Sequence, residues 1–188
     1  MNIGLYFGSF NPVHIGHLII ANFVATTTEI DQVWLIVSPQ NPLKPSNSLL
    51  NEYHRLHLVN LAIGENSKLR ASDVEFKLPR PSYTIDTLTY LSERYPQHTF
   101  SVIIGSDSYQ NLRKWKNFEV LVRNYPILVY NRPGFEITEP LASVKVLKSP
   151  MLDISATLIR QFIKERRSVQ YLLPDKVLEE IELNNYYR

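Results

Sequence analysis

The most informative part of this sequence is the stretch Gly4-Leu5-Tyr6-Phe7-Gly8-Ser9-Phe10-Asn11-Pro12-Val13-His14-Ile15-Gly16-His17. Its apolar start, residues 3–7, is short enough for a buried strand. Residues 8–12 carry turn-forming side chains, and the apolar residues after His17 predict a helix. A strand that leads through a small-residue turn into a helix start can bind phosphate. The first N–H groups of a helix have no partner within it, and the helix dipole favours an anion there.

The two histidines of this stretch are its chemical groups. His14 and His17 are three residues apart, so we expect both rings on one side of the first helical turn. Histidine can donate to phosphate oxygens and to charge that builds up in a transition state. Gly16 costs about 1 kcal/mol of helix propensity but allows a close approach. The chain has no cysteine and no acidic residue adjoins the pair, which disfavours zinc. We therefore prefer a phosphate site over ordinary cap or surface histidines.

The composition limits the class of protein. A chain of 188 residues with 44% hydrophobic residues suits one compact domain. The absence of cysteine excludes disulfides and thiolate chemistry. The net charge is only +2 and no basic block stands out beyond residues 164–167, so nucleic-acid binding is not indicated. No signal peptide and no membrane-spanning run are recognisable, so we expect no membrane association and a cytoplasmic protein.

A second apolar strand over residues 32–37 indicates the fold class. A strand, a helix and a strand at this spacing imply parallel pairing in an α/β layered fold. Ligands bind such sheets beyond the carboxyl ends of the strands. The loop after this strand holds Lys44 between Pro42 and Pro45, so we expect Lys44 at the same edge as the histidines. A lysine on a proline-stiffened loop there is a candidate phosphate ligand.

Later segments follow the same pattern. A strand over residues 99–104 ends in Gly105-Ser106-Asp107, and a strand over 127–130 precedes Arg132. We expect Ser82 or Thr84 to cap a helix, and Ser155 to cap another. The other expected elements are strands at 69–76 and 144–147 and helices at 52–63 and from about 175.

Several motifs resemble a known family. Gly8-x-Phe10-x-Pro12-x-His14-x-Gly16-His17 resembles the signature of the nucleotidyltransferase superfamily, and also the HIGH element of class I aminoacyl-tRNA synthetases. Three later motifs narrow the resemblance to the bacterial nicotinate-nucleotide adenylyltransferases. They are Pro81-Ser82-Tyr83-Thr84-x-x-Thr87-Leu88, Arg132-Pro133-Gly134 and Ile154-Ser155-x-Thr157-x-Ile159-Arg160. Together the motifs run from residue 4 to residue 160.

The resemblance implies a fold and a reaction. The fold would be a Rossmann-like, doubly wound parallel sheet flanked by helices, of the nucleotidyltransferase type. Residues 1–188 would form a single nucleotidyltransferase domain with a small C-terminal helical portion from about residue 154. The enzyme would transfer AMP from ATP to nicotinate mononucleotide, giving nicotinate adenine dinucleotide and pyrophosphate in NAD biosynthesis. Mg²⁺ would arrive with ATP and take no ligand from the protein.

The resemblance also implies site residues. The catalytic, charge-stabilising group would be His14, His17, Lys44 and Arg160. The ATP-binding group would be Gly8, Ser9, Phe10, Gly105, Asp107, Ile154, Ser155 and Thr157. The group that binds nicotinate mononucleotide would be Ser82, Tyr83, Thr84, Trp115 and Arg132. Trp115 would stack on the pyridine ring, although its sequence context also allows a core position.

The sequence leaves several questions open. Gly8-Ser9-Phe10-Asn11-Pro12 departs from the usual bacterial form and also occurs in the eukaryotic branch, so an enzyme that prefers nicotinamide mononucleotide stays open. A phosphopantetheine adenylyltransferase or cytidylyltransferase, a synthetase fragment and a non-catalytic nucleotide sensor stay open as well. The family often has an arginine at the position of Arg55, but the sequence does not show where it faces. The C-terminal helix serves either packing or contact between copies of the chain, which leaves a homo-oligomer open.

Overall fold

The computed structural model describes residues 1–40 and 49–188. Its centre is a six-stranded parallel sheet with the order β3-β2-β1-β4-β5-β6. This order reverses direction between β1 and β4, as in doubly wound folds, and ligands bind beyond the strand ends at such a point. The predicted fold class is therefore confirmed. The strands are β1 Asn2–Gly8, β2 Gln32–Val37, β3 Leu69–Ser72, β4 Thr99–Gly105, β5 Ile127–Tyr130 and β6 Val144–Leu147.

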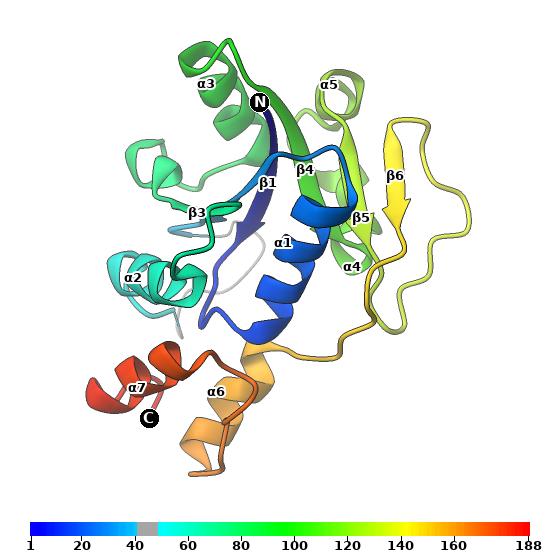
Figure 1. The fold of residues 1–188 in the computed structure, drawn as a ribbon. Coiled ribbons are helices and arrows are strands. Elements are labelled where there is room, and N and C mark those ends of the chain that lie inside the picture. Colours follow the sequence, from blue (N-terminus) through cyan, green and yellow to red (C-terminus); the bar gives the residue numbers. More distant parts are fainter. Residues whose placement is uncertain (41–48) are drawn as a thin grey trace.

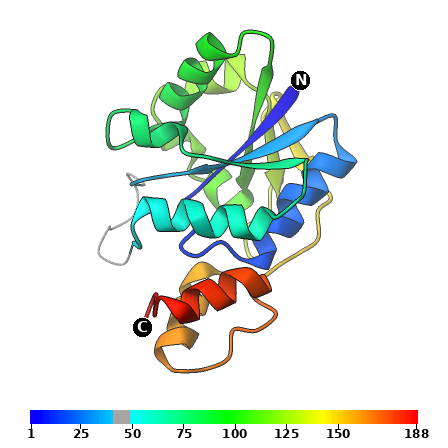
Figure 2. The same cartoon turned by 60° about the vertical axis from the view of Figure 1, so that its left-hand side comes forward.

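Helices cover both faces of the sheet (Figures 1 and 2). One face packs against α1 Ile15–Thr27 and α2 Glu52–Ile63, and the C-terminal helices α6 Ala156–Lys164 and α7 Asp175–Leu183 join them. The other face packs against α3 Thr84–Arg94 and α5 Phe118–Asn124. Short helical turns are α4 Ser106–Tyr109, η1 Val74–Lys77 and η2 Leu112–Lys114. Within the two described ranges, no helix is both long and apolar enough to cross a membrane.

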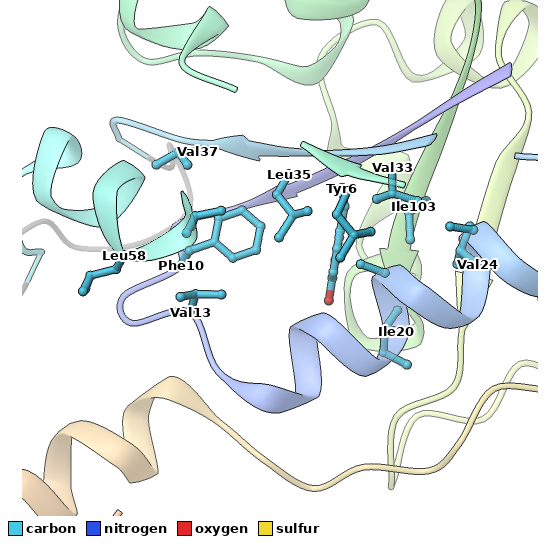
Figure 3. Close-up of a cluster of buried hydrophobic side chains, with 14 of the residues drawn as sticks. Tyr6, Phe10, Val13, Ile20, Val24, Val33, Leu35, Val37, Leu58 and Ile103 are labelled. Carbon is cyan, nitrogen blue, oxygen red and sulfur yellow. The ribbon is translucent and has the colours of Figure 1, made fainter. Parts of the chain in front are cut away.

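Two hydrophobic cores lie on opposite faces of the sheet. Successive side chains of a strand point to opposite faces, so β1 sends Leu5 into one core and Tyr6 into the other. Figure 3 shows the core that contains Tyr6, in which Phe10 and Val13 from the β1–α1 turn lie among strand and helix side chains. Because Phe10 and Val13 are buried, the turn that leads to the histidines is anchored in the core.

One predicted strand is wrong in its second half. The expected strand at residues 69–76 ends at Ser72, and a single helical turn over Val74–Lys77 replaces the rest. In this turn Glu75 is buried, and its carboxyl group accepts hydrogen bonds from three hydroxyls. These partners come from distant segments, so the alternating pattern of residues 69–76 gives no sign of them.

Candidate active site

The histidine pair lies at the start of α1. His14 occupies the N-cap position, and its ring stacks on that of His17 with centroids 3.7 Å apart and planes inclined by 27°. The main-chain N–H of His14 donates to Nδ1 of His17 over 3.2 Å. A neutral His17 therefore carries its proton on Nε2. The prediction that both rings lie on one side of the first turn is confirmed.

His14 is buried and chemically unusual. Only 5% of the residue is exposed, and Nδ1 has no hydrogen-bond partner among the described residues. Burial, and then the charge of Arg132, lower the pKa of His14 to about 4. A Cβ at position 16 would lie 3.0 Å from Nδ1 of His14 and 3.6 Å from Cβ of Ile154, so Gly16 makes room for both neighbours. The ring is thus neutral, with an unsatisfied nitrogen where an anion is expected.

The Ile154–Arg160 motif lies beside the histidine turn, although the two are far apart in sequence. The guanidinium of Arg160 donates to the carbonyl oxygen of Asn11 over 2.7 Å and to the Thr157 hydroxyl over 3.4 Å. Ile154 lines a small cavity together with both histidines. Ser155 caps α6, because its Oγ accepts from the Leu158 N–H over 3.2 Å. The structure therefore brings Arg160 next to the histidine turn with which the resemblance groups it, and the expected cap by Ser155 is confirmed.

Arg132 also belongs to the histidine cavity. Its Nε lies 4.0 Å from the Asp107 carboxylate, and its main-chain N–H donates to Oγ of Ser106 over 2.8 Å. Tyr83, Thr84 and Trp115, which the resemblance groups with Arg132 as nicotinate mononucleotide ligands, line the neighbouring cavity. Arg132 thus lies on the histidine side, and its contact with the acceptor stays a prediction.

The second cavity measures about 360 Å³ and opens at the start of α3. It brings together the predicted acceptor ligands Ser82, Tyr83, Thr84 and Trp115 and the predicted ATP ligands Gly8 and Gly105. Trp115 is half-buried, packs against the core and also lines this cavity, so its stacking on the pyridine ring stays a prediction. Tyr6 and Tyr130, whose hydroxyls are 3.0 Å apart, line both cavities. The two cavities are therefore neighbours.

Comparisons with known proteins agree with this geometry. Residues 5–162 match the model of the family described as Cytidylyltransferase-like. The "Probable nicotinate-nucleotide adenylyltransferase" of Cytophaga hutchinsonii is 50% identical over 189 residues, covering 100% of this chain and 98% of the relative. The Flavobacterium psychrophilum protein of the same name is 47% identical over 192 residues, with 100% of both chains covered. The chain belongs to the nicotinate-nucleotide adenylyltransferase family.

A solved structure shares the fold. The nicotinic acid mononucleotide adenylyltransferase of Plasmodium falciparum, in complex with NaAD, superposes with a TM-score of 0.86 at 23% identity. The match covers 99% of this chain and 97% of the other. The family and enzyme class predicted from the sequence are thus confirmed.

The family's Ser-Tyr-Thr motif begins α3 differently from the prediction. Tyr83 is the N-cap residue, and no side chain caps the helix. Ser82 instead donates its hydroxyl to Oε2 of Glu75 over 2.6 Å, and Thr84 is already the first helical residue. The expected cap by Ser82 or Thr84 is therefore wrong, because a buried carboxyl group competes for the Ser82 hydroxyl. Glu75 itself was not predicted, since none of the motifs in the sequence contains it.

Phe10 is a buried residue that packs against His17. Its ring is only 2% exposed and meets the His17 ring edge-on with centroids 5.0 Å apart. A Cβ at Gly8 would lie 2.9 Å from the Phe10 ring, so the bare glycine is needed for this packing. The Phe10 side chain is therefore engaged in packing, and the ATP contact predicted for this residue stays a prediction.

Arg55 faces the interior and does not enter either cavity. Its guanidinium donates over 2.5–3.2 Å to carbonyl oxygens in three places: the histidine turn, the end of β2 and the segment before α2. The accepting residues are Ser9, Ser38, Pro39 and Leu50. Arg55 therefore fixes the main chain of two strand ends.

Two predictions are not settled by this geometry. Lys44 lies outside the described residues. No cluster of three or more histidine, cysteine or acidic side chains that could hold a metal occurs in the described part of the chain. The role of Mg²⁺ as a partner of ATP stays a prediction.

Proposed function

We propose that this chain transfers AMP from ATP to nicotinate mononucleotide, forming nicotinate adenine dinucleotide and pyrophosphate in NAD biosynthesis. The observation that carries the proposal is the pairing of two neighbouring cavities. One is lined by the stacked histidines, Arg132 and Ile154, and the other opens at the uncapped start of α3. Relatives that cover the whole chain carry the matching name.

The histidine cavity is the proposed site of phosphoryl chemistry. An oxygen of the acceptor's 5′-phosphate attacks the α-phosphorus of ATP, and the bond to the bridging oxygen of the β-phosphate breaks. Such transfers depend on positioning and on stabilising charge more than on a protein base. Donors to the phosphates are His14, His17, Arg132 and Arg160, with Lys44 as the predicted fifth. The start of α6, through Ile154, Ser155 and Thr157, adds hydroxyls and the positive end of a helix dipole.

The remaining predictions concern the adenosine part of ATP and its Mg²⁺. Gly105 ends β4 and Asp107 lies in α4 just after it, at the switch point of the sheet, where we place the adenosine. A Cβ at Gly105 would collide with an Asp107 carboxylate oxygen and lie 3.0 Å from Cδ of Arg132, so this corner is closely packed. Mg²⁺ accompanies the triphosphate, since this ion keeps several waters and takes phosphate oxygens as ligands.

The start of α3 is the proposed nicotinate site. Among the described residues, the N–H groups of Thr84 and Ile85 donate to no protein acceptor, and both residues line the second cavity. Free N–H groups at a helix start suit the nicotinate carboxylate. A nicotinamide would turn its own NH₂ toward these donors and leave groups unpaired. The rings of Tyr83 and Trp115 border the same cavity, where a flat pyridine ring can stack.

A comparison of acceptors tests this proposal. Purified chain is assayed for pyrophosphate release with ATP and Mg²⁺, using nicotinate mononucleotide, nicotinamide mononucleotide or phosphopantetheine. We expect kcat/KM for the acid to exceed that for the amide by about 10-fold or more, the size of one mispaired buried group. A preference for the amide or for phosphopantetheine would overturn the assignment. CTP in place of ATP tests the nucleotide in the same way.

A further inference from the structure

Glu75 is a buried carboxyl group at the edge of the acceptor cavity. The residue is 1% exposed, and no ion pair links it to a cation in the described part of the chain. Burial of such a group is costly unless hydrogen bonds compensate. Its compensation comes from three hydroxyls. Oε2 accepts from Ser38 over 2.5 Å and from Ser82 over 2.6 Å, while Oε1 accepts from Thr87 over 2.9 Å.

These hydroxyls come from the segments that form the cavity. Ser38 follows β2, whereas Ser82 and Thr87 flank the first turn of α3. Arg55 holds the Ser38 carbonyl oxygen over 2.7 Å, so Glu75 joins α3 to a strand end that is itself fixed. The position of the α3 start relative to the sheet therefore depends on Glu75.

The hydrogen bond from Ser82 to Glu75 also concerns the free N–H groups at the start of α3. A serine hydroxyl two residues before an N–H can accept from it, as in local turns that compete with helix formation. Ser82 stands in this relation to Thr84, whose N–H has no protein acceptor among the described residues. In the structure the Ser82 hydroxyl donates to Glu75, and among the described residues its oxygen accepts no hydrogen bond from the Thr84 N–H.

We propose that Glu75 is a positioning residue for acceptor binding, which withholds the Ser82 hydroxyl from α3 and keeps the first N–H groups of the helix open for the acceptor's anionic group. This inference deepens the proposed function and depends on it. Glu75 acts through Ser82, Ser38 and Thr87 and makes no contact with the reacting atoms.

The test begins with Glu75→Met. The thioether keeps the length of the side chain but offers no oxygen acceptor, so Ser82 is released toward α3. We expect KM for nicotinate mononucleotide to rise about 10-fold, the effect of losing one hydrogen bond to a charged group, while KM for ATP stays within about 2-fold. Glu180→Met on α7, remote from both cavities, is the matched control and should leave all constants unchanged.

A double variant separates this role from simple structural support. In Glu75→Met/Ser82→Ala the competing hydroxyl is absent, so KM for nicotinate mononucleotide should be at least about 3-fold lower than in Glu75→Met. A purely structural role predicts that the double variant is no better than Glu75→Met. That result, or an unchanged KM in Glu75→Met, overturns the inference.

Two further measurements keep the test decisive. If Glu75→Met does not fold, Thr87→Val replaces it. This change removes one of the three bonds, so it should raise the same KM about 3-fold, and no rise overturns the inference. If the unmodified chain does not adenylylate nicotinate mononucleotide at all, the proposed function fails instead, independently of the variants.

Discussion

The helices α3 and α6 both begin beside the proposed substrates, yet their first turns are completed differently. At α6 the Ser155 side chain accepts a hydrogen bond from the Leu158 N–H. At α3 no side chain takes this role, and the serine that precedes it donates to Glu75. A capped start still carries the dipole and offers a hydroxyl proton, whereas an uncapped start offers its N–H groups themselves.

The difference fits what each helix is proposed to meet. The α6 start lies among side chains that are proposed to donate to phosphates, so it need not supply every donor. The anion proposed for the α3 start is a single flat carboxylate, for which two adjacent N–H groups are a good match. A missing cap, which costs about 1 kcal/mol at an ordinary helix, is therefore a useful sign of a ligand site when the free N–H groups line a cavity.

The largest expected effect is a loss of kcat at the proposed phosphate site that leaves acceptor binding nearly unchanged. His17→Ala should lower kcat by about 100-fold or more, the size of losing one donor to a developing charge. KM for nicotinate mononucleotide should change by about 3-fold at most, because the α3 start is untouched. Steady-state pyrophosphate release measures both constants. His57→Ala, an exposed histidine on α2, is the control, and an unchanged kcat in His17→Ala would remove its proposed role.

The next effect concerns the protonation of His14. Its pKa is lowered to about 4 in the folded chain, from an ordinary value of 6.5, so the unfolded chain binds the proton more readily. The stability due to the neutral ring is present above pH 6.5 and is lost as the pH falls toward 4. Between about pH 7 and about pH 5 this amounts to a loss of about 2 kcal/mol.

Denaturant unfolding across this pH range checks the prediction. In His14→Gln the free energy of unfolding should fall less steeply with pH, by about the same 2 kcal/mol. Equal slopes in the two proteins would show that His14 is not the buried neutral group inferred here.

The smallest effect tests the missing cap directly. Tyr83→Ser and Tyr83→Ala both remove the ring, but only serine can cap α3. We expect Tyr83→Ser to be about 1 kcal/mol more stable than Tyr83→Ala, and its KM for nicotinate mononucleotide to be about 5-fold higher, because the cap competes with the acceptor. Thermal unfolding and steady-state kinetics measure the two quantities. Equal KM values would show that the N–H groups of α3 do not bind the acceptor.

Local patterns predicted much of this molecule. Apolar strand runs separated by turns and helix starts were enough to predict the parallel sheet. The His14–His17 spacing was enough to predict that both rings lie on one side of a turn. The approach of Arg160 to the histidine turn followed from the family motifs. Each of these features either repeats along a short segment or belongs to a recognisable motif.

The parts that escaped prediction depend on contacts between distant segments. The local pattern around Glu75 predicts a strand, and the pattern around Ser82 predicts a helix cap. Neither segment contains a sign of the hydrogen bond between the two side chains. Lys44 and the division into domains stay predictions.

Arg55 has a consequence for how this active site can change. One side chain binds carbonyl oxygens at the ends of two neighbouring strands, and a planar fork of donors is needed to do so. A lysine would offer a single point of attachment in its place. Substitutions that shift the main chain after β2 will therefore also move the histidine turn, so evolution or design cannot readily adjust the acceptor side of the enzyme while leaving its phosphate side as it was.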